Sequence, residues 1–279
     1  MHPGSEHKAD QGHKKTWNRL RTGHGKPNNH QRTFLQCPGA YVYDGLPVES
    51  ELVFWGEWEP QALVLHRFRT LEEGHPRFIF QPYYEKPNRY VGLHNTDPFV
   101  FGGFYYTFCY QRGNARTKHM SQGSVVLFGS HRRGQFFLDT VLVVKNLLDH
   151  DKVGWRMELK SRVPEAYQDV TIEPGYASGQ TSYRLYFGAT DREPYEGMYS
   201  FFPCLPAGQQ PKSFARPKIV LPGVVSGGMK QNYKAESLAS ITEARDIWEA
   251  VREQVIQQGL AIGIGAQIPE QKGEHIGAL

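Results

Sequence analysis

Over most of its length the chain alternates short apolar runs with turn-forming residues, a pattern typical of β-strands. From Phe34 onward these runs are separated by breakers such as Asp44-Gly45 and Asp97-Pro98. Strands are expected at 40–43, 51–58, 62–68, 77–83, 99–111, 124–129, 135–144, 169–172 and 183–188. Their regular spacing predicts an α+β, mostly β fold, built as a barrel or a sandwich.

A helical pattern appears only near the end of the sequence. Ser240-Ile-Thr-Glu243 has the spacing of a capping box, and apolar residues then recur every three or four positions up to Ile256. Gly259 is the expected stop. The sequence therefore predicts a C-terminal amphipathic helix with Trp248 on its buried face. A short helix, a long loop and a small-residue tail are expected at 147–151, 207–232 and 259–266.

The first 33 residues differ from the rest of the chain. They contain five His and seven Lys or Arg among Gly, Asn and Gln, with too few apolar residues to offset the entropy of ordering. Residues 1–33 are expected to be a disordered basic tail. A single β-rich domain is expected over 34–279, with a subdivision near residue 150 as the alternative.

The cellular compartment is predicted from three features that the sequence lacks: a membrane span, a signal peptide and closely spaced cysteines. No segment approaches the roughly 18 apolar residues needed to cross a bilayer, and the start has no apolar signal-peptide region. Cys37, Cys109 and Cys204 lie far apart, which fits reduced thiols and gives no zinc spacing. We therefore expect a cytoplasmic protein with no membrane partner and no metal.

The formal net charge of +4 is unevenly distributed. Outside the tail, the basic charge is concentrated in residues 112–133, which contain five Lys or Arg and no Asp or Glu. These candidate phosphate-contacting residues are Arg112, Arg116, Lys118, Arg132 and Arg133. Such a segment suits contacts to nucleic-acid phosphates, and a solvated charged face explains it equally well.

Aromatic and acidic residues are concentrated in Phe54-Trp-Gly-Glu-Trp58-Glu59. In a strand, Trp55, Glu57 and Glu59 would share one face, and Phe54 and Trp58 the other. Aromatic rings beside a carboxylate can hold a nucleic-acid base, whereas an amphipathic edge strand would use the same residues for its core. Neither interpretation is favoured.

Two further groups of polar residues are candidates. His94-Asn95-Thr-Asp97-Pro98 precedes an aromatic run, and His94 with Asp97 could act as an acid–base pair. A turn that satisfies its own backbone is the favoured alternative. Asp139 lies in a nearly continuous apolar strand, so it must pair, take up a proton or line a pocket. A buried pair with an arginine is favoured.

Two adjacent segments resemble the central hairpin of the PUA-like superfamily, which includes the EVE, ASCH and YTH domains. These are Gly123-Ser-Val-Val-Leu-Phe-Gly-Ser130 and Gly134-Gln-Phe-Phe-Leu-Asp-Thr-Val-Leu-Val-Val144, joined by a short basic turn. The resemblance covers roughly residues 40–150. It implies a mixed or antiparallel PUA-like barrel that recognises nucleic acid, often through a modified or flipped base, and it implies no cofactor.

Three functions follow from these observations. In the first, a binding module contacts phosphates through the basic segment and holds a base or nucleotide in a pocket made of Trp55, Glu57, Trp58, Asn95, Asp97, Tyr106 and Asp139. In the second, an enzyme acts on a nucleotide or a glycosidic substrate through Glu57 with Glu59, or through His94 with Asp97. In the third, the aromatic strands and the C-terminal helix serve assembly with a protein partner. The sequence does not indicate an oligomeric state.

Overall fold

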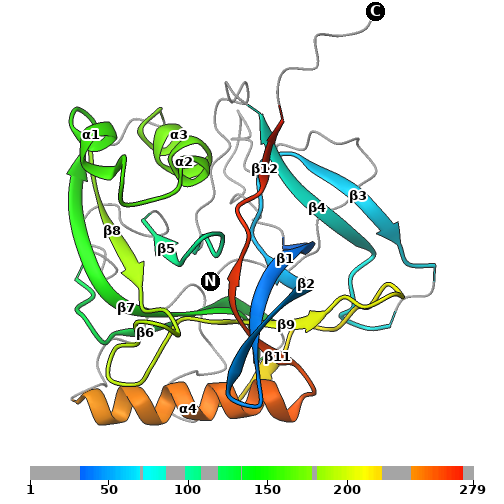
Figure 1. Cartoon of the computed structure of the whole chain (residues 1–279). Helices are drawn as coiled ribbons and strands as arrows, with labels where there is room; N and C mark the ends of the chain where they lie inside the picture. Colours follow the sequence, from blue (N-terminus) through cyan, green and yellow to red (C-terminus); the bar gives the residue numbers. More distant parts are fainter. Residues whose placement is uncertain are drawn as a thin grey trace, which may run out of the picture.

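The computed structural model describes residues 32–69, 72–85, 98–107, 119–132, 134–177, 181–221 and 240–272. Within these residues the fold is α+β and mostly strands, arranged as two sheets with helices at their margins (Figure 1). None of the helices described here is long and apolar enough to cross a membrane.

The first sheet has seven strands. They are β1 (Thr33–Tyr43), β2 (Leu46–Gly56), β3 (Ala62–Arg67), β4 (Phe78–Glu85), β9 (Phe202–Pro206), β11 (Ala261–Ala266) and β12 (Glu270–Lys272). Asp44 and Gly45 both have positive φ, of 50° and 75°, which matches the tight turn that joins β1 to β2. Antiparallel pairings run from β1 to β2, β9, β11 and back to β1, so these four strands form a closed ring.

The second sheet has five strands and is organised around one long strand. They are β5 (Tyr105–Tyr106), β6 (Val125–Arg132), β7 (Gln135–Asp151), β8 (Ser182–Gly188) and β10 (Lys218–Ile219). β7 pairs antiparallel with β6, β8 and β10, and in Figure 1 it sweeps in a curve across the molecule. This sheet is open, so the described strands do not form one clear barrel.

The helices lie at two places. α1 (Trp155–Leu159), α2 (Glu165–Tyr167), the π-helix η2 (Gln168–Ile172) and α3 (Glu173–Ala177) follow the far end of β7. α4 (Ile241–Gln257) crosses the base of the molecule in Figure 1. The Ser240 hydroxyl accepts a hydrogen bond from the Glu243 backbone N–H at 3.2 Å, and Trp248 is buried. β11 and β12 follow this helix, so it is not the last element.

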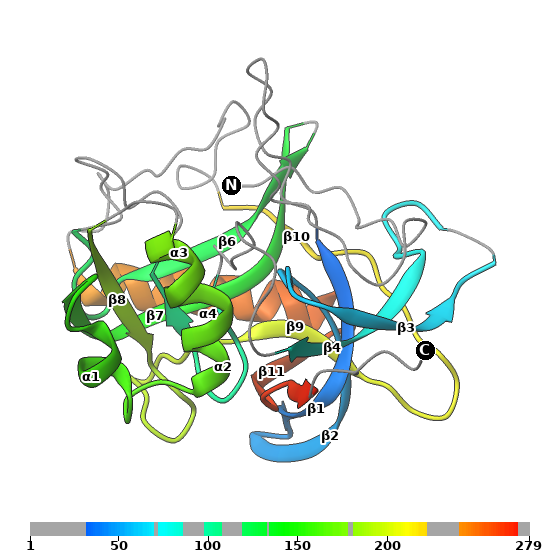
Figure 2. The same ribbon diagram turned by 90° about the horizontal axis from the view of Figure 1, so that it is seen from above.

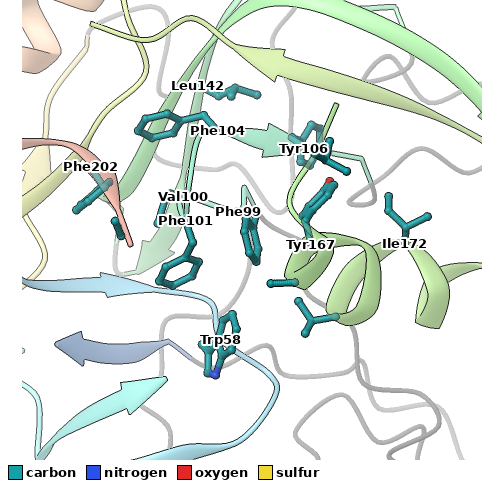
Figure 3. Close-up of a cluster of buried hydrophobic side chains, with 14 of the residues drawn as sticks. Trp58, Phe99, Val100, Phe101, Phe104, Tyr106, Leu142, Tyr167, Ile172 and Phe202 are labelled. Atoms are coloured by element: carbon teal, nitrogen blue, oxygen red, sulfur yellow. The ribbon is translucent and has the colours of Figure 1, made fainter. Parts of the chain in front are cut away.

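Two hydrophobic clusters fill the interior, and β7 contributes to both. Alternate side chains of a strand point to opposite faces, so Leu142 and Val144 enter one cluster while Val141 and Val143 enter the other. Figure 3 shows the first cluster, which contains Trp58, Phe99, Phe101 and Tyr167. We call these the Trp58 cluster and the Trp55 cluster. Trp55 lies on β2, and Trp58 lies just after the end of this strand.

Three regions differ from the sequence-based expectation. Residues 147–151 continue β7 instead of forming a short helix, because each pairs with β8 and the Asp149 carboxylate holds Arg184 across the strands at 2.6 Å. Residues 169–172 belong to η2, not to a strand: burial of Val170 and Ile172 in the Trp58 cluster overrides their β-branched preference. The small-residue segment expected as a tail forms β11, a strand of the ring.

Candidate nucleic-acid interface

Of the basic candidates from the sequence, the structure describes only the backbone of Arg132, at the end of the β6–β7 hairpin. Arg132 is opposite Gln135 in the register, so the chain reverses at residues 133–134, and the hairpin projects from the sheet in Figure 2. The register shifts between Phe128 and Gly129, which leaves Asp139 as the extra residue on β7. A β-bulge of this kind turns one side chain out of the regular alternation.

That side chain, Asp139, is held by a buried arginine. Arg32 Nε lies 2.5 Å from Asp139 Oδ2, and Arg32 Nη1 lies 3.5 Å from Glu57 Oε2. The Arg32 and Glu57 side chains are each 1% exposed and that of Asp139 is 4% exposed. Removing one partner of such a buried pair typically costs about 3–5 kcal/mol, because the remaining charge is left in the interior. These contacts therefore tie β1 and the end of β2 to β7.

Arg32 and Thr33 were expected to lie in the disordered tail, but both belong to the folded structure. Arg32 and Thr33 are buried at 1% and 2% exposure, and β1 begins at Thr33. The favoured interpretation of Asp139, a buried pair with an arginine, agrees with the structure. The arginine was not identifiable from sequence, because nothing local distinguishes Arg32 from the six other basic residues around it.

A second arginine connects the hairpin to the segment before β10. Arg216 Nη1 donates to Ser130 Oγ at 2.6 Å and lies 3.5 Å from Asp139 Oδ1. Its guanidinium carbon lies 5.7 Å from the centre of the Trp55 ring, within cation–π range. Trp55 Nε1 in turn donates to the Phe214 carbonyl at 2.8 Å. The segment around Phe214–Arg216 is thereby fixed against β2, β6 and β7.

β10 follows directly and brings more basic charge to the hairpin. Lys218 pairs with Phe137 on β7, close to the turn, and is exposed, whereas the exposed Lys212 donates to the Pro206 carbonyl at the end of β9 at 3.2 Å. The sequence from 197 to 235 contains no Asp or Glu. Sequence reasoning treated 207–232 as a loop and missed these residues, although the same absence of acids had identified 112–133. The structure thus joins two acid-free basic segments at one end of β7.

The predicted aromatic pocket is not formed in the described structure. Trp55 is 4% exposed and lies in the Trp55 cluster, whereas Trp58 and Tyr106, each 2% exposed, lie in the other cluster. Figure 3 places Phe99 between Trp58 and Tyr106. As expected, Trp55 lies on the opposite side from Phe54 and Trp58, and this separates the two indoles. All three rings therefore serve the core.

The carboxylate candidates are buried as well. β2 ends at Gly56, so Glu57 and Glu59 are not on a strand. Counted as whole residues, backbone included, they are 6% and 1% exposed. Glu57 faces Arg32 as described above. The remaining candidates, His94, Asn95, Asp97, Arg112, Arg116, Lys118 and Arg133, lie outside the described residues, as does the side chain of Arg132.

Neither metal ligands nor reactive thiols stand out in the part of the chain that is described. No group of three or more His, Cys, Asp or Glu side chains there could hold a metal ion. Cys37 and Cys204 are buried and unlinked, and burial raises the pKa of both thiols. A high thiol pKa disfavours the nucleophilic thiolate.

Comparisons with protein-family models, curated proteins and solved structures gave no match for this chain.

Proposed function

We propose that this protein binds nucleic acid through the basic surface at the β6–β7 turn and β10. The observation that carries the proposal is the β10–β7 pairing, which places Lys218 beside the hairpin that ends in Arg132. Lys and Arg side chains gathered without acids attract a polyanion and gain affinity by releasing its counterions. The PUA-like resemblance, which rests on the same hairpin, supports the same class of ligand.

The buried ion pairs support this role by fixing the surface. Arg216 links the segment carrying Lys212 and Lys218 to Ser130 on β6, and Arg32 holds Asp139 on β7. Basic side chains on a rigid base lose less conformational entropy on binding than those on a mobile loop. The aromatic residues Trp55, Trp58 and Tyr106 are buried, so the proposed contacts are with phosphates and require no stacked base.

The test is a salt titration of the full chain with a fluorescein-labelled single-stranded RNA. Replacing Arg132 and Lys218 by Ala is expected to weaken binding about five- to tenfold and to lower the slope of log affinity against log salt by about 1.4, two phosphate contacts at ~0.7 each. Arg132→Ala with Arg133→Ala should act in the same direction. Lys218 is exposed, and circular dichroism checks that each variant is folded.

The matched control is Lys152→Ala with Lys160→Ala, which removes the same charge. These lysines are also exposed, and they lie beyond the other end of β7, some 45 Å from Phe137 along the strand at roughly 3.3 Å per residue. The control should bind as the unaltered protein does. A flat salt response, or equal losses in the test and control variants, would contradict the proposal.

A further inference from the structure

One edge of the second sheet remains open. Among the described residues, β6 pairs only with β7, and its side chains from Val125 to Phe128 are partly exposed. The strand is almost wholly apolar up to Gly129, with Val125 and Leu127 packing on the Trp55 cluster and Val126 and Phe128 on the Trp58 cluster. Both faces of β6 therefore pack on the core, whereas no described strand pairs with the edge that faces away from β7.

The hydrogen bonds of β7 show which backbone groups of β6 point outward. Val141 exchanges both of its backbone hydrogen bonds with Phe201, at 2.8 and 2.9 Å, so it makes none with Leu127 opposite. In an antiparallel pair, the N–H and C=O of such a residue point away from the partner strand. Leu127 therefore directs its N–H and C=O away from β7.

The same argument applies two residues earlier. The Val143 carbonyl accepts from the Ala189 N–H at 2.7 Å, and its own N–H donates to Ser200 Oγ at 3.0 Å. Val125 lies opposite Val143, so its backbone N–H and C=O also point away from β7. Val125 and Leu127 together offer two donors and two acceptors at the spacing of a strand ladder.

Several of the other described strand edges are protected, whereas no described strand pairs with the open edge of β6. β3 has a bulge between Val64 and His66, β5 and β12 are only two and three residues long, and the β10 edge is hydrogen-bonded by Gln254 and Gln258 of α4. Bulges, short strands and covering elements are the usual means of preventing strand addition. Val125–Phe128 has no Pro, Lys or bulge.

We infer that the β6 edge accepts an extended segment of another protein as an added strand, an inference that does not rest on the proposed nucleic-acid binding. The segment would be mostly apolar and would carry Asp or Glu at the end beside Arg132. Charge favours this occupant over a second copy of the chain, because residues 119–138 contain no acid to complement Arg132. Main-chain hydrogen bonds would give affinity and the charge would set direction.

The first experiment leaves the protein unaltered. A fluorescein-labelled peptide of two aspartates followed by alternating valine and threonine is titrated into the full chain. Single N-methyl groups are then moved along the valine–threonine part. Strand addition predicts an affinity loss of tenfold or more at every second position, because only alternate N–H groups face β6. An equal effect at all positions, or no binding of the parent peptide, would overturn the inference.

The second experiment alters the edge. Leu127→Pro removes an outward N–H but no β6–β7 hydrogen bond, and it should weaken peptide binding at least tenfold while leaving RNA binding unchanged. Leu65→Pro, at the exposed bulge of β3, is the matched control and should bind the peptide normally. Circular dichroism checks the fold of both variants, and Val125→Pro is the replacement if Leu127→Pro unfolds. If Leu127→Pro left peptide binding unaffected, the assignment would be contradicted. It would also be contradicted if the unaltered protein formed a dimer that Leu127→Pro abolished, because a second copy would then occupy the edge.

Discussion

At the scale of single residues, a buried histidine shows how closely the interior is matched to one protonation state. His150 is 3% exposed, with Nδ1 2.7 Å from the Tyr176 hydroxyl and Nε2 3.4 Å from the Thr107 hydroxyl. Thr107 donates onward to the Arg184 carbonyl at 3.1 Å. The Tyr176 hydroxyl also donates to the His150 carbonyl at 3.0 Å, so the ring lies between two hydroxyls that each bond a backbone carbonyl.

Burial lowers the pKa of His150 to about 4, against the opposing effects of Asp149 and Asp151. In the unfolded chain the ordinary pKa is about 6.5, so between these values the unfolded state binds more protons. We predict that His150 has no effect on the pH dependence of stability above about pH 6.5. As pH falls to 4, it should remove up to about 3 kcal/mol of unfolding free energy.

The measurement compares the unaltered protein with His150→Gln, which cannot take up a proton. Urea unfolding of both proteins from pH 7.5 to pH 4 should give free energies that fall more steeply for the unaltered protein. The difference cancels the contributions of other titrating groups. Parallel curves would show that His150 does not titrate in this way.

For a buried charged residue, the sequence predicts that a partner must exist but does not identify that partner. An acid in an apolar strand requires a partner, and Asp139 has one in Arg32. The identity of that partner depends on a contact between residues 107 positions apart, which no local pattern encodes. Arg216 was missed for the same reason, since its contacts to Ser130 and Trp55 also join distant segments.

At the scale of elements, α4 completes the second sheet with side chains instead of a strand. Gln258 accepts from the Lys218 N–H at 3.0 Å and donates to the Lys218 carbonyl at 3.1 Å. Gln254, one turn earlier, makes the same pair of contacts with Val220 at 2.9 and 3.2 Å. The two amides thus satisfy the backbone groups on the edge of β10.

We predict that Gln254→Ala with Gln258→Ala lowers the free energy of unfolding by about 2 kcal/mol. Six side-chain hydrogen bonds are lost, four to residues 218 and 220 and two to carbonyls of the helix itself, but water replaces part of each because the site is partly exposed. Gln257→Ala, an exposed glutamine of the same helix, is the control for helix propensity and should change stability by less than about 0.5 kcal/mol. Urea unfolding measures all three proteins, and equal stability of the double variant and the control would refute the prediction.

Elements with strong local signals were predictable, and those set by pairing were not. The capping box marks the start of α4, and the β3, β4, β6 and β8 strands lie close to their expected positions. β9 and β11 were missed because they contain two Pro and two Gly respectively, and β10 because it has only two residues; only long-range partners hold all three as strands. Pairing partners of this kind are not visible in local periodicity.

At the scale of the whole molecule, the two clusters share β7 and should not unfold separately. Leu142 and Val144 lie in the Trp58 cluster, and Val141 and Val143 lie in the Trp55 cluster. The Trp58 cluster also takes residues from both sides of position 150, from Leu35 to Ala266. Loss of packing on one face of β7 would expose the strand that supports the other face.

The tryptophans allow this coupling to be measured, since Trp155 of α1 lies in the Trp58 cluster and Trp248 of α4 lies in the Trp55 cluster. With 5-fluorotryptophan incorporated, each indole gives its own ¹⁹F signal, assigned by single Trp→Phe variants. We predict that the native signals of Trp155 and Trp248 disappear at the same urea concentration, as required for a two-state transition. If Trp155 lost its native signal well before Trp248, the chain would instead consist of two units that unfold independently, and the alternative subdivision near residue 150 would be correct.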